Sequence, residues 1–448
     1  MTDLAELRRA AREIFDRALK SVDAGAAVRR AVSVEGSRLK LGDTSVDLGG
    51  SRSRVYSIAL GKAALQMARA LSERLGERLA AGVITAPAAE ISVPDCWRVF
   101  SGGHPLPDGE SLRAARAAFE LLRRANDEGA PVIFLISGGG SAMMEWPREA
   151  GTTLEELRLM NEMLVRCGAS ISEINSVRRA VSAVKGGGLA RLAPDCEQVS
   201  LIVSDTNPGD EAAVASGPTF DETKEGPDAN DVIARHRLAT KLPASVLRAV
   251  RSACEATPPD SARTIRRHYV LLDNESALAS AAEAARSLRF NVEVARDVIE
   301  QPVAEGCAAL LSKLLRRGAD GGRGVCLISG GEFACPVRGG GRGGRNSESA
   351  LRWAIELDAL TKGGAPFTHA VALSAGTDGV DGNSPAAGAV ADETTVARAR
   401  RLDLDARRFL DESDAYTFFD RLGDAIVTGP TGTNVRDVRV LLAGRLED

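Results

Sequence analysis

The residues best suited to chemistry in this sequence are basic and hydroxyl side chains beside runs of glycine. The segment Ser137–Ser141 reads Ser-Gly-Gly-Gly-Ser directly after an apolar run. Successive glycines let backbone N–H groups approach an anion closely, and the two hydroxyls add donors. We therefore predict a phosphate-binding loop at Ser137, Gly138, Gly139, Gly140 and Ser141. The alternative is a tight turn between a strand and a helix that holds no ligand.

A second glycine run, Gly339–Asn346, contains two arginines and leads into a helical pattern. It contains a match to the dinucleotide fingerprint G-x-G-x-x-G, but the acidic residue expected about 20 positions later is missing. The first acid after the next apolar strand is Asp378. Arg345, at the start of the helix, better suits a transferring phosphoryl group or a substrate carboxylate. The alternative, stronger for Arg342, is an exposed basic loop tip.

Lys62 follows Gly61 at the end of another apolar run. It is not a Walker A lysine, because Ala63 replaces the required Ser or Thr and the upstream glycine is absent. A lysine at the end of a strand is commonly a solvated surface residue. Its place directly after a glycine, at the edge where ligands bind in α/β sheets, makes an active-site role the competing interpretation.

Acidic residues follow several predicted strands. We predict Asp205, Asp210, Glu332 and Asp378 as Mg²⁺ ligands, since Mg²⁺ is commonly held by one or two carboxylates and by water. Asp205 could instead accept a hydroxyl proton. The competing interpretation for each aspartate is an Asx turn beside glycine, and we expect this role for Asp381.

Composition excludes several classes of function. The 448 residues carry a formal net charge of −4, and only 11 Phe, 3 Trp and 3 Tyr are present. A nucleic-acid-binding protein normally has a basic footprint and stacking aromatics, so we expect no nucleic-acid partner. The seven cysteines form no C-x-x-C pair, which is typical of reduced thiols in the cytoplasm. No apolar run is long enough to span a bilayer, so we expect no membrane partner.

Short β-branched runs alternate with longer helical patterns, which indicates an α/β protein with parallel layering. The predicted strands are Val55–Leu60, Val132–Ile136, Val199–Val203, Tyr269–Leu272, Val292–Ala295, Val325–Ile328, Ala370–Leu373 and Val438–Leu442. The predicted helices are Ser111–Ala125, Leu154–Cys167, Ile171–Val184, Ser276–Leu288 and Ser347–Leu360.

The phrase Leu-Ile-Ser-Gly-Gly occurs twice, at 135–139 and at 327–331. Each copy ends an apolar strand, and a polar, charged stretch with Pro243 lies between the two halves of the chain. We therefore predict two α/β domains with a ligand cleft between them.

Taken together, the motifs resemble those of the class II glycerate 2-kinases, the MOFRL family, whose members were often labelled hydroxypyruvate reductases. The matching phrases occur in the family's order over nearly the whole chain. They are Leu60–Ala63, Gly102–Pro105, Ser137–Ala142, Val177–Arg178, Lys185–Gly187, Ala215–Thr219, Ser329–Glu332, Gly341–Asn346, Ser374–Gly379 and Thr428–Val435.

This resemblance implies a Rossmann-like N-terminal domain with a mostly parallel sheet, placed at 1–240, and a C-terminal α/β domain at 241–448. It implies an active site between them that transfers a phosphoryl group from ATP to the 2-hydroxyl of D-glycerate, giving 2-phosphoglycerate and ADP, with Mg²⁺. The family's catalytic lysine and arginine map onto Lys62 and Arg345. We expect Asp205 to be the third catalytic residue.

The same matches extend the predicted site. We expect ATP or its phosphates to contact five further residues, Lys185, Asn346, Thr431, Thr433 and Asn434. We expect Arg178 to join Lys62 and Arg345 in substrate binding. The predicted partners are glycerate and ATP, and a homodimer is one oligomeric state that the sequence allows.

Alternatives remain open at this stage. One is an NAD(P)-dependent hydroxypyruvate reductase, and another is a non-catalytic binding protein on the same scaffold. A third is a kinase of a related 2-hydroxy acid or sugar acid, because the chain departs from the family pattern at Ser347 and at Asn383–Pro385.

Overall fold

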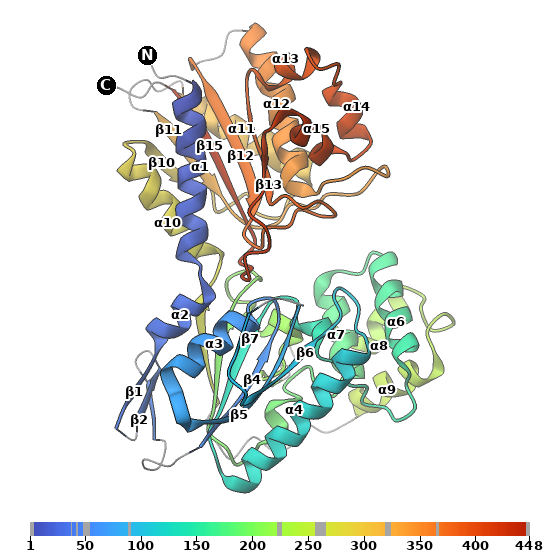
Figure 1. Ribbon diagram of the computed structural model, residues 1–448. Helices are drawn as coiled ribbons and strands as arrows, with labels where there is room; N and C mark the ends of the chain where they lie inside the picture. Colours follow the sequence, from blue (N-terminus) through green and yellow to red (C-terminus); the bar gives the residue numbers. More distant parts are fainter. Residues whose placement is uncertain are drawn as a thin grey trace. The chain divides into compact units, whose positions relative to one another are not determined.

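The computed structural model describes residues 4–36, 38–41, 44–47, 54–87, 91–221, 226–255, 266–318, 324–363 and 367–444. The chain forms two compact units (Figure 1). We call Ala24–Leu272 the parallel unit, and Met1–Asp23 together with Asp273–Asp448 the mixed unit. This division differs from the predicted boundary at residue 240, both at the N-terminus and in the middle of the chain.

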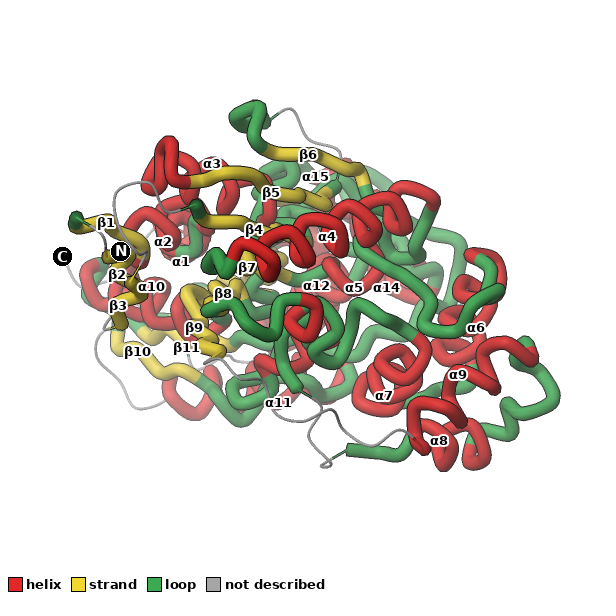
Figure 2. Tube along the Cα trace, turned by 90° about the horizontal axis from the view of Figure 1, so that it is seen from below, coloured by secondary structure: helices red, strands yellow, loops and turns green. Residues whose placement is uncertain are grey.

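The N-terminal helix explains the first difference. Helix α1 (Leu4–Ser21) buries one apolar face, and it lies beside α10 (Asn274–Ser287) of the mixed unit (Figures 1 and 2). Arg8 pairs with Asp392 and Asp424 of the same unit. The second difference arises because β9 (Arg266–Leu272) completes the sheet of the parallel unit.

All six strands of the main sheet in the parallel unit run in one direction, in the order β6-β5-β4-β7-β8-β9. This is the doubly wound order of a Rossmann fold, which confirms the predicted Rossmann-like domain. The strands are β4 (Val55–Leu60), β5 (Leu79–Ala86), β6 (Trp97–Ser101), β7 (Val132–Ser137), β8 (Gln198–Val203) and β9. Strands β4, β7 and β8 are buried along their whole length, as expected for strands covered on both faces.

Helices α3 (Ala64–Leu75) and α4 (Gly109–Glu128) pack on this sheet, and the short α5 (Gly140–Met143) follows β7. A separate apolar cluster joins four helices, which gather at one end of the unit in Figure 2: α6 (Leu154–Arg166), α7 (Ile171–Val181), α8 (Ala229–Arg235) and α9 (Ala244–Glu255). The remaining elements are α2 (Ala24–Ala31), the antiparallel strands β1 (Val32–Glu35), β2 (Arg38–Leu41) and β3 (Thr44–Asp47), and three 3₁₀ turns (Gly76–Arg78, Ala190–Leu192, Glu211–Ser216).

The sheet of the mixed unit has the order β10-β11-β15-β12-β13-β14. Among its neighbouring pairs, only β10 and β11 are parallel, and the other four pairs are antiparallel. Its strands are β10 (Asn291–Val294), β11 (Val325–Ser329), β12 (Ala370–Gly376), β13 (Gly388–Asp392), β14 (Ala425–Ile426) and β15 (Asp437–Ala443). Parallel layering is therefore confirmed for the first sheet and wrong for the second. The last strand, β15, runs antiparallel between β11 and β12, so its first residues lie at the edge where those two strands end.

The helices of this unit, besides α1 and α10, are α11 (Val303–Gly318), α12 (Arg345–Gly363), α13 (Thr395–Arg400), α14 (Ala406–Asp411) and α15 (Ala415–Leu422). All eight strands and five helices predicted from the sequence are present, with ends shifted by a few residues. Among the described residues, no helix is both long and apolar enough to cross a membrane.

Candidate active site

The order of the parallel sheet identifies its ligand edge. Chain connections leave β4 toward β5 on one side and enter β7 on the other, so the topological switch point lies between β4 and β7. Ligands of doubly wound folds bind beyond the carboxyl ends of the strands at such a point. Lys62 follows β4, and the loop Ser137–Ser141 follows β7. Both features predicted to bind an anion therefore lie at the switch point.

Hydrogen bonds fix Lys62 beside the loop. The backbone N–H of Lys62 donates to the carbonyl of Gly138 at 2.9 Å. The Ser137 hydroxyl accepts from the N–H of Ala63 at 3.0 Å and donates to the carbonyl of Leu60 at 3.3 Å. Lys62 is half-buried, whereas Ser137 is fully buried. The Ser137 side chain therefore ties the two strand ends together.

Two further side chains reach this loop. A Cβ added to Gly138 would overlap the carboxylate oxygen Oδ2 of Asp205, which follows β8. A Cβ added to Gly139 would lie 3.2 Å from Cδ2 of His104, an exposed residue that follows β6. Residue 138 must be glycine for the carboxylate to approach so closely. The structure therefore places Asp205, Lys62 and His104 beside the same loop.

The sequence analysis assigned no role to His104, although this residue lies in the matching phrase Gly102–Pro105. Strand β6 positions this histidine, and β6 was not among the predicted strands. Its five residues are Trp-Arg-Val-Phe-Ser, of which only Trp97 is buried and Val99 is exposed, so it lacks the continuous apolar run of the central strands. The signal available in the sequence was the glycine pair before His104.

The end of the loop is held from behind by a chain of polar side chains. The hydroxyls of Ser141 and Ser216 are 2.9 Å apart, and the Ser216 hydroxyl lies 3.0 Å from Oδ1 of Asn175. Ser216 is buried, and both Ala215 and Ser216 have positive φ, at 50° and 61°. Such conformations are costly for residues other than glycine and persist where the surrounding structure enforces them.

Lys185, predicted to bind ATP or phosphate, contacts Glu145 and not the glycine loop. Its ammonium group is buried and paired with Glu145, whose Oε1 accepts from the Ser182 hydroxyl at 2.5 Å. Burial lowers the pKa of Lys185. A buried cation that already has a carboxylate partner is a structural link, and it joins the segment after α5 to the end of α7.

Arg178 and Asp210 also make their contacts away from the glycine loop. Arg178 donates from Nε to Oδ1 of Asn161 at 2.7 Å, and burial lowers the pKa of Arg178. Asp210 is exposed and begins a 3₁₀ turn. Among the described residues, no group of three or more His, Cys, Asp or Glu side chains is arranged to hold a metal ion.

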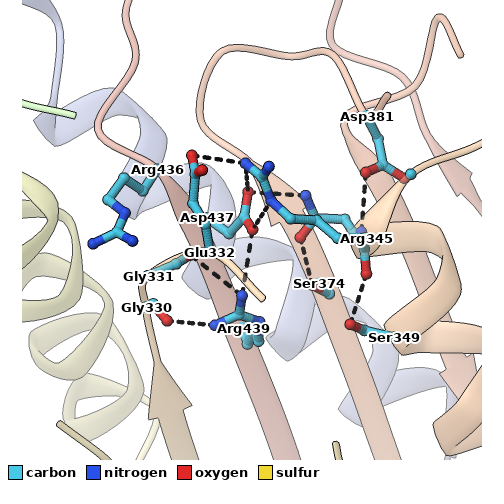
Figure 3. Close-up of polar contacts among 12 residues, drawn as sticks. Gly330, Gly331, Glu332, Arg345, Ser349, Ser374, Asp381, Arg436, Asp437 and Arg439 are labelled. Atoms are coloured by element: carbon cyan, nitrogen blue, oxygen red, sulfur yellow. Dashed lines mark hydrogen bonds and ion pairs between the residues drawn. The ribbon is translucent and has the colours of Figure 1, made fainter. Parts of the chain in front are cut away.

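In the mixed unit, Arg345 begins α12 and its guanidinium is held by two carboxylates (Figure 3). Asp437, the first residue of β15, accepts from Nε at 2.6 Å and from Nη2 at 3.2 Å. Glu332, after β11, lies 2.7 Å from Nη2. Burial disfavours the cation, but Asp437 and Glu332 together raise the pKa of Arg345 above its ordinary value.

Arg439 lies beneath this pair and is fully buried. It donates to the carbonyls of Gly330 and Gly331, lies 3.3 Å from Oδ2 of Asp437, and stacks over the Phe333 ring at 3.5 Å. Burial lowers the pKa of Arg439 to about 10. The second Leu-Ile-Ser-Gly-Gly copy therefore binds an arginine of the protein itself through its glycine carbonyls.

The N-terminus of α12 is capped by a carboxylate of the chain itself. The carboxylate of Asp381 accepts from the N–H of Asn346 at 2.9 Å, from the N–H of Ser347 at 2.8 Å and from the Ser347 hydroxyl at 2.6 Å. Burial raises the pKa of Asp381. The expected Asx turn at Asp381 is wrong, because its side chain bonds a helix distant in sequence. Asn346 is buried and donates to Asp437 at 2.9 Å.

The glycine run before α12 packs against the corner between α14 and α15. A Cβ added to Gly341 would overlap Asp414, so glycine is needed there for packing. Arg342 lies over the ring of Tyr416 at 4.9 Å and its N–H donates to Asp414 at 2.7 Å. These contacts, with Asp381 at the helix start, contradict a dinucleotide-binding turn at Gly339–Gly344.

The remaining predicted residues surround the loop before β15. The N–H of Thr431 donates to the carbonyl of Asp378 at 3.2 Å, and Oδ1 of Asp378 accepts from the N–H of Val380 at 3.1 Å, which is an Asx turn. Thr433 is buried, and Oδ1 of Asn434 accepts from the N–H of Arg436 at 3.1 Å. These groups shape the edge beside Arg345 through contacts within the chain.

Comparison with known proteins supports one family. A model described as a domain of unknown function (DUF4147) matches residues 10–251, and the MOFRL family model matches residues 325–437. The D-glycerate 2-kinase of Thermotoga maritima is 33% identical over 86% of this chain and 89% of that protein. The glycerate 2-kinase of Pyrococcus horikoshii is 32% identical over 98% of this chain and 97% of that protein. The crystal structure of the T. maritima glycerate kinase matches with a TM-score of 0.80 at 30% identity, covering 98% of this chain and all of that one. The chain therefore belongs to the class II glycerate 2-kinase family, which carries the MOFRL domain.

Proposed function

We propose that this protein is a glycerate 2-kinase that transfers the terminal phosphoryl group of ATP to the 2-hydroxyl of D-glycerate, giving 2-phosphoglycerate and ADP. The observation that carries this proposal is the convergence of Lys62, the glycine loop and Asp205 at the switch point of a Rossmann-type sheet. The relatives from T. maritima and P. horikoshii bear the name of this activity.

The proposed roles follow from charge and position. Phosphoryl transfer depends chiefly on positioning and on neutralising negative charge. Gly138, Gly139 and Gly140 offer backbone N–H groups to anionic oxygens, and Lys62 and Arg345 neutralise the substrate carboxylate and the moving phosphoryl group. We propose that these two cations, one from each unit, act on the same substrate.

Asp205 is the carboxylate best placed to help at the loop, either by accepting the hydroxyl proton or as a Mg²⁺ ligand. When bound, Mg²⁺ neutralises charge on the phosphate oxygens of ATP. A single carboxylate fits this ion, because Mg²⁺ in kinases is completed by substrate phosphates and water. Of the other predicted ligands, Asp210 is exposed, Glu332 is paired with Arg345, and Asp378 forms a turn.

The structure favours the kinase over the reductase. A dinucleotide would need the N-terminus of α12 for its pyrophosphate, but the Asp381 carboxylate fills that position. The departures from the family pattern are also accounted for within the chain. Ser347 bonds Asp381, and Asn383 accepts from the N–H of Gly343 at 2.8 Å, so neither change argues for a different acceptor.

Phosphorus NMR after incubation with ATP, Mg²⁺ and D-glycerate tests the proposal. We expect 2-phosphoglycerate and ADP, and we expect Arg345→Ala to abolish the product. A 3-phosphoglycerate signal, or turnover by Arg345→Ala within a few-fold of the wild type, would contradict the assignment. Oxidation of NADH by hydroxypyruvate in the absence of ATP would support the reductase instead. We propose a cytoplasmic location, consistent with seven free cysteines.

A further inference from the structure

The guanidinium of Arg345 is shared by two carboxylates that differ in burial (Figure 3). The side chain of Asp437 is 1% exposed, whereas that of Glu332 is 35% exposed and that of Arg345 is 33% exposed. Asp437 also accepts from Asn346 and lies beside Arg439, so its position is fixed from several sides. Glu332 pairs with Arg345 at a partly exposed position.

The two carboxylates use different parts of the guanidinium. A guanidinium presents five N–H groups in a fixed fork. Asp437 takes the side formed by Nε and Nη2. The second N–H of Nη2 points to the other end of the guanidinium, which is formed by Nη1 and Nη2. Glu332 lies 2.7 Å from Nη2. With the Nε side taken by Asp437, this end is where a further carboxylate or a phosphoryl group can bind two donors at once.

We propose that Glu332 is a displaceable carboxylate that occupies the anion-binding end of Arg345 until an anionic group of the substrate replaces it. This inference rests on the proposed function, in which Arg345 neutralises such a group. Glu332 then sets the selectivity of the site. A monodentate anion gains little by displacing a carboxylate, whereas a carboxylate or phosphoryl group that engages both Nη atoms gains a second hydrogen bond.

The backbone before Glu332 is held firmly, so an anion can replace the Glu332 side chain at Arg345 while Gly330 and Gly331 stay in place. The carbonyls of Gly330 and Gly331 are held by Arg439, and the N–H of Gly331 donates to Oδ1 of Asn274 at 3.0 Å. The main chain before Glu332 is thus anchored. The pair between Glu332 and Arg345 is partly exposed, and an ion pair that water reaches is weaker than a fully buried one such as that of Asp437.

The test is Glu332→Gln, which keeps the shape of the side chain and removes its charge. Dissociation constants for inorganic phosphate and for D-glycerate are measured in separate NMR titrations without nucleotide. We expect one or both to fall by about tenfold, since removal of one negative charge a few ångströms away is worth roughly that factor. Tighter binding of D-glycerate alone would identify the carboxylate as the occupant, and tighter binding of phosphate alone would identify the phosphoryl group.

Two controls make the result specific. Glu293→Gln breaks a pair with Arg317 in the same unit and should leave both constants unchanged. Adding Arg345→Ala to Glu332→Gln should remove the gain. Unchanged or weaker binding of both anions by Glu332→Gln would overturn the inference. Because these titrations need no turnover, a failure of the proposed function would be seen separately, as absence of 2-phosphoglycerate from the wild-type protein.

Discussion

Asp437 holds Arg345 by two hydrogen bonds, of 2.6 Å to Nε and 3.2 Å to Nη2, although the two residues are 92 positions apart in sequence. The antiparallel course of β15 makes this contact possible. It delivers the first residue of the strand to the edge where β11 and β12 end. The arginine is therefore oriented from the sheet, and its Nη2 also lies 2.7 Å from Glu332.

The substitution Asp437→Asn tests this orientation. It leaves Arg345 and Arg439 without their shared buried carboxylate, and breaking a buried ion pair costs about 3–5 kcal/mol. We expect a lower unfolding temperature and a fall in kcat/KM of about a hundredfold, on the scale of losing one well-placed charge contact. Chemical denaturation and a coupled kinase assay measure the two effects.

The matched control is Asp16→Asn, which removes an exposed partner of Arg12 and should change stability by less than about 1 kcal/mol. Asp437 would not be what orients Arg345 if Asp437→Asn left the free energy of unfolding unchanged and kept kcat/KM within a factor of about three of the wild type.

A second prediction concerns the approach of Asp205 to the glycine loop. In Gly138→Ala, the new Cβ takes the space of the Asp205 carboxylate, which must rotate away. We expect kcat to fall by about a hundredfold, while the fold persists because only the end of one side chain has to move. Steady-state kinetics and circular dichroism separate the two.

Gly340→Ala is the control, because a Cβ at residue 340 meets no atom within 4 Å. Wild-type kinetics in Gly138→Ala would mean that Asp205 has no catalytic part in this loop.

A third prediction is a pH dependence of stability in the helices after the loop. Hydrogen bonds from the Ser170 backbone and from His236, Ser170 and Arg235 lower the pKa of Glu173 to about 2, from an ordinary value of 4.5. Because the folded-state pKa is depressed, Glu173 stabilises the fold above about pH 5, and this stabilisation is lost as the pH falls toward 2.

We expect Glu173→Gln to be less stable than the wild type at pH 7, and the difference to shrink steadily below pH 5. Thermal unfolding across this range measures the difference. A gap that stays constant from pH 7 to pH 3 would show that the charge of Glu173 is not responsible.

The parallel unit was predictable from sequence to a large extent. Continuous apolar runs such as Val132–Ile136 mark buried parallel strands, and the glycines and Lys62 directly after them mark the ligand edge. The short edge strand β6 carries no such run, so His104 was overlooked.

The mixed unit was less predictable, because strand direction is not encoded in composition. Val438–Leu442 was recognised as a strand, but in a parallel sheet its start would lie at the edge away from the ligand. Asp437 and Arg439 were therefore not considered, although charged residues within an apolar strand signal buried pairing. The N-terminal helix α1 was misassigned for a related reason, since nothing local indicates which distant sheet an amphipathic helix covers.

We propose that Lys62 and Arg345 act on one substrate, and a double-mutant cycle on kcat/KM for D-glycerate measures whether they do. We expect the charge-conserving variants Lys62→Arg and Arg345→Lys to keep measurable activity, each about a hundredfold below the wild type. Residues that act together are strongly non-additive, so we predict that the double variant is at most about tenfold worse than the poorer single variant. A loss of about ten-thousandfold in the double variant, the product of the two single losses, would show that the two cations act independently and would contradict a shared substrate.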